Sequence, residues 1–198
     1  MGPGVSLAVA RRFEREGYTI AAVSRNGFSQ AGRAFLADAG DEQSLRQCLC
    51  SIRSEMGDPE VLVYNASAGT PGPPASLNRD ALVRDFEVNV VGAVVAAQEF
   101  APAMVKAGRG TILISGGGLA LEPMAEIASL SLGKAAIRSL SFSLAKELGT
   151  AGIHVATVTI CGFVEEGTRF APGLIADEYW RLHTQPQLEW QREVIYKV

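Results

Sequence analysis

The sequence has little cysteine and little histidine, the side chains from which disulfide frameworks and metal centres are most often built. Its 198 residues include 3 cysteines and 2 histidines. Cys48, Cys50 and Cys161 form an odd set without the spacing of a zinc site, whereas a disulfide framework needs an even number. We therefore expect free thiols, no metal site and a reducing compartment, for which the cytoplasm is the default.

Long apolar runs and an excess of charge of one sign are missing as well. No apolar run approaches the ~18 residues that span a bilayer. Arg11, Arg12 and Glu14 follow the N-terminus too closely for the apolar core of a signal peptide. The net charge is −3, with 18 basic and 21 acidic residues interspersed, which gives no electrostatic basis for binding nucleic acid or an anionic membrane. We expect neither as a partner.

The composition is that of a globular protein, 47% hydrophobic and 20% charged. Along the chain, the spacing of the apolar residues alternates between the period of a helix and that of a strand. Helical spacing of apolar residues predicts helices, and short apolar runs between turn residues predict strands. Helices are predicted at 5–17, 41–55, 78–107, 125–148 and 174–183, and strands at 19–23, 33–37, 61–64, 111–114, 155–160 and 192–197. This alternation predicts one domain, 1–198, of α/β class: a doubly wound, Rossmann-like parallel sheet in a three-layer α/β/α arrangement.

Residues that carry chemistry follow these strands, where a doubly wound sheet binds its ligands. Gly2-Pro3-Gly4 precedes the first helix, whose N-terminus offers free N–H groups to a phosphate. The later residues of this kind are Asn65-Ala66-Ser67 after a buried strand, Asn89 and Lys134 on the two long helices, and Cys161-Gly162 after the next-to-last strand. In this order and spacing the set resembles the short-chain dehydrogenase/reductase family over nearly the whole chain. The resemblance implies an NAD(P)-dependent oxidoreductase acting on a small carbonyl or alcohol substrate.

The resemblance also assigns residues to a cofactor groove and an active site. Ser24-Arg25 stands where the family reads the adenosine ribose; no carboxylate is present there, and an arginine can pair with a 2′-phosphate, so NADP is favoured over NAD. The residues implied to bind the cofactor are Gly2, Gly4, Ser24, Arg25, Asn26, Asp38, Asn65, Ala66, Ser67, Lys134 and Gly162. The implied catalytic residues are Asn89, Ser115 and Lys134.

Two positions depart from the family pattern at its catalytic centre. Leu130, four residues before Lys134, stands where the family has the tyrosine that exchanges a proton with the substrate oxygen. The family's serine falls at Gly116 or Gly117, which leaves Ser115 as the nearest hydroxyl. Three hypotheses stay open: an oxidoreductase in which water or another hydroxyl relays the proton, a catalytically silent NADP-binding sensor or partner subunit, and a truncated product that binds no cofactor.

The family's first strand has no counterpart here, because it should precede Gly2. That strand would lie between those at 19–23 and 61–64, and its loss leaves two strand edges unpaired, at about 1–3 kcal/mol for each buried polar group. The stretch from Asn26 to Gly32 is also too short for a crossover helix, which needs about ten residues. Either the chain is a fragment or has a misassigned start, which we favour, or the sheet closes in an unusual way. By resemblance we also expect a homodimer or homotetramer formed through the two long helices.

Overall fold

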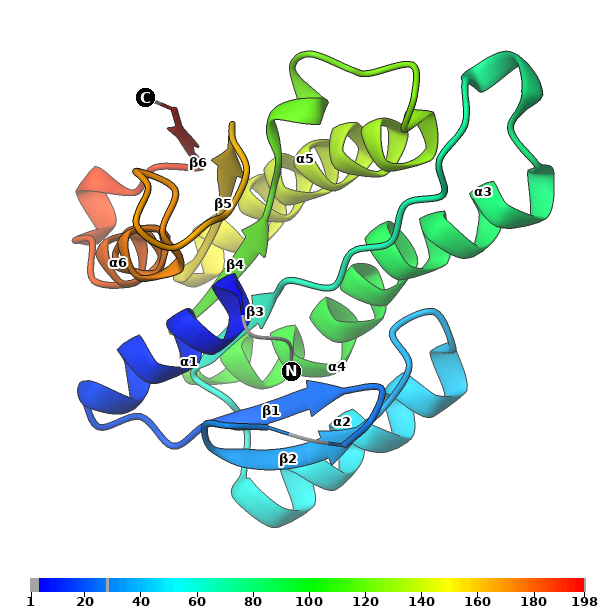
Figure 1. Ribbon diagram of the computed structural model, residues 1–198. Helices are drawn as coiled ribbons and strands as arrows, with labels where there is room; N and C mark the ends of the chain where they lie inside the picture. The colour runs from blue at the N-terminus through cyan, green and yellow to red at the C-terminus, as the bar shows by residue number, and fades with distance from the viewer. Residues whose placement is uncertain (1–3, 28, 198) are drawn as a thin grey trace.

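The computed structural model describes residues 4–27 and 29–197 of the chain. Helices and strands alternate along it, as the sequence pattern predicts (Figure 1). The helices are α1 (Val5–Arg15), α2 (Glu42–Met56), α3 (Arg79–Phe86), α4 (Gly92–Ala107), α5 (Ala128–Leu148) and α6 (Pro172–His183). The strands are β1 (Ala21–Ser24), β2 (Arg33–Leu36), β3 (Val61–Tyr64), β4 (Gly110–Ser115), β5 (Ile153–Ile160) and β6 (Glu193–Tyr196). Every predicted element is present, with ends shifted by only a few residues.

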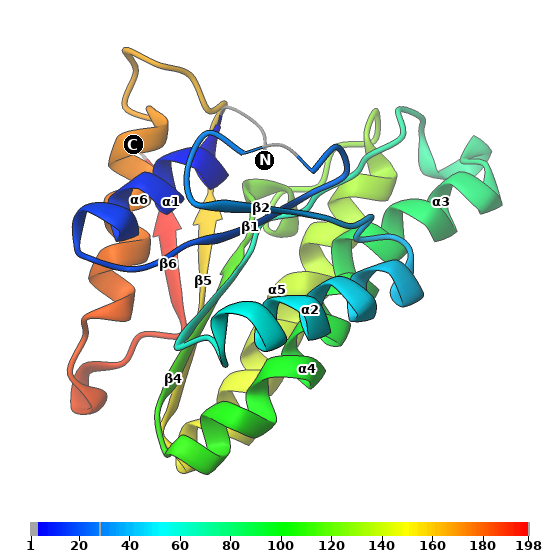
Figure 2. The same ribbon diagram turned by 90° about the horizontal axis from the view of Figure 1, so that it is seen from below.

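All strand pairs are parallel, and helices cover both faces. Strands β3, β4, β5 and β6 form one sheet in that order, and β1 pairs with β2 in a second. Figure 2 shows α1 and α6 on one side of the strands and α2, α4 and α5 on the other. This arrangement confirms the predicted α/β, Rossmann-like fold with three layers.

Each face of the strands has its own apolar core. On one face, α2, α4 and α5 pack against the sheet through a cluster that includes Leu49, Phe100 and Ile114. On the other, α1 and α6 pack through a cluster that includes Phe13 and Tyr179. The central strands β4 and β5 are buried, and most of their residues are apolar, as expected for parallel strands covered by helices on both faces.

Local sequence signals explain where the helices begin. Asp41 caps α2 by accepting a hydrogen bond from the Ser44 backbone N–H at 3.0 Å. Asn78 caps α3 in the same way, through the Ala81 backbone N–H at 3.0 Å. Helices α3 and α4 join through one π-helical turn, Glu87–Val91, so they form the single long helix that the sequence predicts. That helix is long and apolar enough to cross a membrane, but 56% of its most apolar window is buried inside the protein, which is typical of a core helix.

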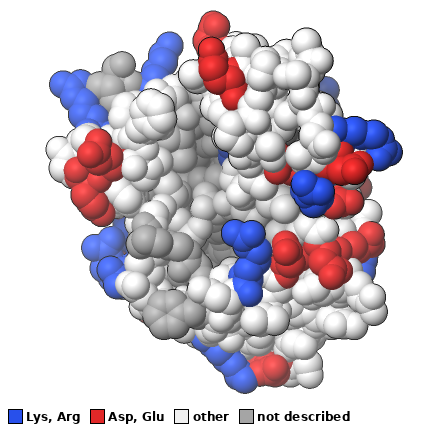
Figure 3. All heavy atoms as spheres, turned by 45° about the vertical axis from the view of Figure 1, so that its right-hand side comes forward, with Lys and Arg blue, Asp and Glu red and all other residues white. Residues whose placement is uncertain are grey.

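The sheet is broken between β1 and β3. No strand among residues 4–27 and 29–197 pairs with the second edge of either one. A cavity of about 710 Å³ lies there, lined by residues of both strands, of α1 and of α2. Figure 3 turns the right-hand side of Figure 1 toward the viewer and shows a face that is hollowed at its centre, with mainly uncharged atoms in the hollow. Strands β1 and β3 therefore do not close up on each other, and the cavity separates the two sheets.

The connection from β1 to β2 is short, as expected. It contains no helix among its described residues, and it turns at Gly27 and Gly32, which both have positive φ. A Cβ at Gly32 would lie 2.4 Å from the Ile20 backbone oxygen, so only glycine fits this turn. The two strands are thus joined side by side without the usual crossover helix.

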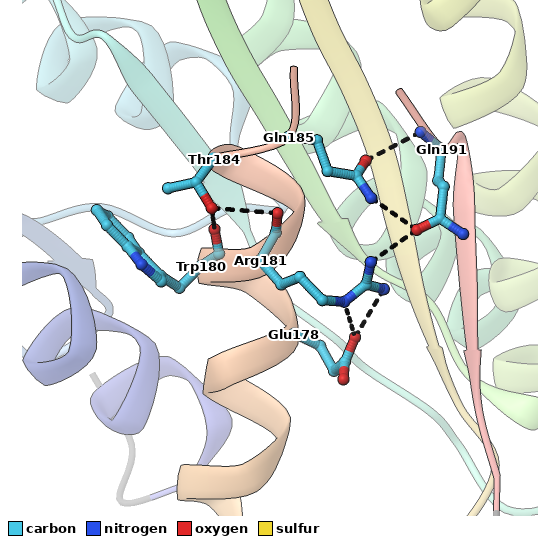
Figure 4. Close-up of polar contacts among 6 residues, drawn as sticks. All are labelled: Glu178, Trp180, Arg181, Thr184, Gln185 and Gln191. Carbon is cyan, nitrogen blue, oxygen red and sulfur yellow. Dashed lines mark hydrogen bonds and ion pairs between the residues drawn. The ribbon is translucent and has the colours of Figure 1, made fainter. Parts of the chain in front are cut away.

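A polar network orders the segment between α6 and β6. The Arg181 guanidinium bonds the Glu178 carboxylate at 2.9 Å and the Gln191 side-chain oxygen at 2.7 Å (Figure 4). Gln185 bonds Gln191 twice, donating to its side-chain oxygen at 2.7 Å and accepting from its backbone N–H at 3.0 Å. These contacts hold the segment that leads from α6 back to the sheet, where β6 pairs with β5.

Candidate functional site

The N-terminus of α1 is open and lies at the rim of the cavity. Gly4 precedes the helix, and a Cβ added to it would meet nothing within 4 Å. The first turn of α1 has neither a side-chain cap nor an acidic residue, so its backbone N–H groups remain available to an anion. Asn65, which follows β3, donates a hydrogen bond from its side chain to the Ser6 hydroxyl in this turn. The predicted Gly2 lies outside the described residues.

Most of the predicted cofactor residues line the same cavity as this helix end. Ser24 ends β1 and Arg25 follows it. The Ser24 hydroxyl donates to the Asn26 side-chain oxygen at 2.9 Å. Asp38 follows β2 and is exposed, with its carboxylate accepting from the Gly40 backbone N–H at 2.9 Å. The predicted residues that line the one cavity are Gly4, Ser24, Arg25, Asp38, Asn65, Ala66 and Ser67.

Asn89 is buried in the π-helical turn between α3 and α4. Its side-chain oxygen accepts from the Ala68 backbone N–H at 2.9 Å, and its side-chain nitrogen donates to the Ala68 backbone oxygen at 2.7 Å. A Cβ at Gly133 of α5 would lie 2.6 Å from that nitrogen, so a glycine is needed where α5 passes. π-Helical turns inside α-helices are frequent at functional sites. Here the turn ties the loop after β3 to the long helix.

Lys134 projects from α5 toward the carboxyl end of β4. Its Nζ donates a hydrogen bond to the Ser115 backbone oxygen at 3.0 Å. Its aliphatic stem covers Gly117, where a Cβ would come within 3.4 Å of Lys134 Cδ and Cε. Burial lowers the pKa of the Lys134 ammonium to about 8, because removal from water disfavours the charged form.

The two departures from the family pattern have clear structural consequences. Leu130 lies one helical turn before Lys134 and packs on Gly69, where a Cβ would lie 2.9 Å from Leu130 Cβ. The Ser115 hydroxyl is buried and shares a hydrogen bond of 2.6 Å with the hydroxyl of Tyr179 on α6. It therefore points to the α1–α6 face of the sheet, and only the Ser115 carbonyl meets Lys134. A catalytic role for the Ser115 hydroxyl stays a prediction that this geometry does not favour.

The loop after β5 is held by close contacts of its glycine. A Cβ at Gly162 would lie 2.3 Å from the Phe170 ring, and one at Gly118 would lie 3.1 Å from the Cys161 backbone. The loops that follow β4 and β5 thus touch each other at the carboxyl edge of the sheet. Gly162 lies at this edge, as predicted, but it does not line the cavity.

A buried carboxylate and a partly buried ion pair near the site were missed by the sequence reasoning. The Asp85 carboxylate accepts from the Ser129 hydroxyl at 2.7 Å and from the Thr70 backbone N–H at 2.6 Å. Burial raises the pKa of Asp85, but these hydrogen bonds outweigh it and hold the pKa below its ordinary value. Asp85 lies four residues before Asn89 on the same helical face, and that spacing could have indicated a shared role in holding the loop after β3.

The second missed group is an ion pair that ties α5 to β6. The Arg138 guanidinium bonds both carboxylate oxygens of Glu193, at 2.8 and 2.6 Å. These bonds lower the pKa of Glu193, against a smaller opposing effect of burial. Arg138 lies one turn after Lys134 on α5, so the pair fixes the helix that presents the lysine.

Known proteins with similar sequences cover most of the chain. Residues 1–175 match the family model described as short chain dehydrogenase. The chain is 28% identical over 191 residues to a sorbitol dehydrogenase of Cereibacter sphaeroides, covering 89% of this chain and 68% of that protein. It is 39% identical over 143 residues to the human 17-beta-hydroxysteroid dehydrogenase type 1, covering 67% of this chain and 43% of that protein.

Solved structures agree on the fold. A metagenomic short-chain oxidoreductase, solved in complex with NADP, superposes with a TM-score of 0.88 at 24% identity and covers 98% of this chain and 92% of its own. A short-chain dehydrogenase from Rhodopseudomonas palustris gives a TM-score of 0.86 at 24% identity, covering 98% of this chain and 93% of its own. At this level of identity the likeness concerns the fold alone.

Proposed function

This chain belongs to the short-chain dehydrogenase family of oxidoreductases, and on that premise we propose that it reduces a carbonyl, or oxidises the matching alcohol, with NADP as the cofactor. The observation that carries the proposal is that Gly4, Ser24, Arg25 and Asn65 line one cavity, where Ser24, Arg25 and Asn65 lie at the carboxyl ends of β1 and β3. This is the edge where parallel α/β sheets bind dinucleotides. The substrate is a small molecule.

The residues present fit the cofactor. The uncapped first turn of α1 supports a pyrophosphate, because its N–H groups and the positive end of the helix dipole point outward. The exposed Arg25 beside Ser24 supports a 2′-phosphate, and no carboxylate ends β1 to repel one. Asp38 lines the same cavity, and we assign it the contact with the adenine edge. The metagenomic short-chain oxidoreductase that shares this fold was solved with the cofactor proposed here.

When bound, NADP supplies or accepts the hydride. The chain's own groups would then orient the substrate and move one proton. Asn89 fixes the loop after β3 through both backbone groups of Ala68. Lys134 holds the mobile proton at Nζ, since a pKa of about 8 lets it both donate and accept near neutral pH. Leu130 offers no proton, so a water would carry it from Lys134 to the substrate oxygen.

Binding of the cofactor is tested first, by calorimetry with NADPH and NADH on the full chain. Arg25→Ala should weaken NADPH binding by roughly 10- to 100-fold, the worth of a charge-assisted hydrogen bond, and leave NADH binding unchanged. Arg79→Ala is the matched control, because Arg79 is exposed and pairs only with its neighbour Asp80 among the described residues. Equal losses for NADPH and NADH would refute the role given to Arg25.

Turnover is tested next, as NADPH oxidation over a broad panel of aldehydes and ketones. We expect measurable turnover that Lys134→Met abolishes without preventing NADPH binding. Bound NADPH with no turnover on any carbonyl would refute the oxidoreductase and leave the catalytically silent binder. That alternative rests on Leu130 and on the glycines at the position of the family's serine, and the comparisons do not support it over the enzyme.

An oligomer formed through the long helices remains part of the proposal. Apolar side chains on α3, α5 and the π-helical turn are at least partly exposed, at 40% for Phe86, 36% for Val91 and 51% for Leu132. A contact between two copies would remove these side chains from water. Sedimentation of the full chain should give a dimer or tetramer, and a monomer at working concentration would contradict it. The three thiols are free, which agrees with the proposed cytoplasmic location.

A further inference from the structure

Asp85 of α3 and Ser129 of α5 meet inside the protein, on the backbone of the loop after β3. The two residues are only 7% and 2% exposed. The Ser129 hydroxyl donates to Asp85 Oδ2 at 2.7 Å. The Thr70 backbone N–H is shared between that oxygen, at 2.6 Å, and the Ser129 hydroxyl oxygen, at 3.0 Å. Hydrogen bonds to a carboxylate are about twice as strong as those between neutral groups, so this pair holds Thr70 firmly.

The loop that the pair holds also lines the cofactor cavity. Residues 65–67 line the cavity, and Thr70 follows them by three positions. Between them, the two backbone groups of Ala68 bond the Asn89 side chain at 2.9 and 2.7 Å. The loop is therefore fastened to the long helix at two points, and Thr70 is the point at which it is fastened to α5 as well. How residues 65–67 sit in the cavity depends on both points.

The loop after β3 lies on one particular side of the proposed cofactor. Ser24 and Arg25 take the adenosine half in that proposal, at the end of β1. Strand β3 borders the cavity on the other side, and β4 is its neighbour in the sheet. Lys134 meets the carboxyl end of β4 through the Ser115 backbone oxygen. A dinucleotide that has its adenosine over β1 therefore has its nicotinamide half along the loop after β3.

We propose that Asp85, acting with Ser129, positions the loop after β3 for the nicotinamide half of the cofactor, an inference that rests on the proposed function. Neither residue is among the described residues that line the cavity, so both are positioning residues and act through the backbone of Thr70. Without the carboxylate, the Thr70 N–H loses its charged acceptor, and the loop has to be ordered when the cofactor binds. That ordering reduces the affinity for the whole dinucleotide. The contacts of the adenosine half stay as they are.

The test compares NADPH with 2′,5′-ADP, which carries the adenosine and its 2′-phosphate but no nicotinamide, by calorimetry on the full chain. Asp85→Ala should weaken NADPH binding by about tenfold and leave the binding of 2′,5′-ADP unchanged. Asp85→Asn keeps an acceptor oxygen at the same reach and should recover part of the loss. Asp80→Ala is the matched control, because Asp80 is an exposed carboxylate of the same helix that pairs with Arg79. It should bind both ligands as the native chain does.

A double-mutant cycle tests whether the two side chains act together. Ser129→Ala should also weaken NADPH binding without changing that of 2′,5′-ADP. Because both residues act on Thr70, the loss in the double variant should be smaller than the product of the two single losses. Independent, multiplicative losses would contradict the joint role. If Asp85→Ala does not fold, Ser129→Ala and Asp85→Asn carry the same comparison between the two ligands.

Two further outcomes overturn the inference and leave the proposed function standing. Equal losses for NADPH and 2′,5′-ADP would show that Asp85 serves only the stability of the fold. Native affinity for NADPH in a folded Asp85→Ala chain would show that the loop does not need the carboxylate. Failure of the native chain to bind NADPH is a separate result, which would overturn the proposed function and this inference together.

Discussion

Replacing Lys134 by methionine should make the protein more stable at neutral pH. Burial lowers the pKa of this ammonium from 10.5 to about 8, which corresponds to about 3 kcal/mol of unfavourable free energy for the charged form. Methionine fills a similar volume without a charge. The substitution also removes the hydrogen bond from Nζ to the Ser115 backbone oxygen, at a loss of about 1–2 kcal/mol. The expected net gain at about pH 7 is therefore about 1–2 kcal/mol in the free energy of unfolding.

The pH dependence of this gain has a definite sign. The unfolded chain keeps its proton on Lys134 up to about pH 10.5, whereas the folded chain releases it above about pH 8. Between these values the unfolded state binds more protons, so the unfolding free energy of the native chain rises with pH. The methionine variant lacks this contribution. The excess of its unfolding free energy over that of the native chain should shrink between about pH 8 and 10.5 and change sign near pH 10.5.

The assay is urea unfolding, followed by circular dichroism, of both proteins at several pH values between about 7 and 10.5. Lys146→Met is the control, because Lys146 is an exposed lysine on the same helix. The difference between that variant and the native chain should not change with pH. If the difference in unfolding free energy between Lys134→Met and the native chain stays constant over this pH range, the Lys134 ammonium is not desolvated and the reasoning is refuted.

Three further substitutions test the packing around the site. Glu193→Gln should lower the unfolding free energy measured in urea by about 2 kcal/mol, because it leaves the Arg138 guanidinium without its carboxylate. The ion pair lowers the pKa of Glu193. The stability that the pair gives the native chain should therefore be present above about pH 4.5 and be lost as the pH falls through the lowered pKa. Tyr179→Phe should cost about 1–2 kcal/mol in the same assay, because it leaves the buried Ser115 hydroxyl without its partner. Gly133→Ala should lower Tm by several degrees, because its Cβ would lie 2.6 Å from the buried asparagine side chain of the π-helical turn.

The order of elements could be predicted because each follows from local periodicity. The strand at Val61–Tyr64 is found where the apolar run between turn residues places it, and Asp41 caps α2 as its position before the apolar pattern indicates. That most of the predicted cofactor residues line one cavity also follows from topology, since the carboxyl ends of parallel strands meet at one edge. These inferences need no knowledge of tertiary contacts.

What could not be predicted depends on contacts between distant segments. The bond between Ser115 and Tyr179 joins residues 64 positions apart, and no local pattern shows that the hydroxyl turns to the α6 side of the sheet. The π-helical turn around Asn89 gives no signal in apolar spacing, because one extra residue in a turn barely changes the periodicity. The burial that lowers the pKa of Lys134 likewise arises only once the helices have packed.

The departure at Leu130 changes the chemistry of the site without changing the framework around it. Asn89 is held by the backbone of Ala68, and Lys134 by the backbone of Ser115. Neither hydrogen bond is made by residue 130 itself, although Leu130 packs on Gly69, the neighbour of Ala68. The leucine therefore removes a proton donor from this position without removing either hydrogen bond. If the chain is the oxidoreductase proposed above, its proton has to come from a group other than residue 130, and the turnover of the Lys134→Met variant tests whether that group is the lysine.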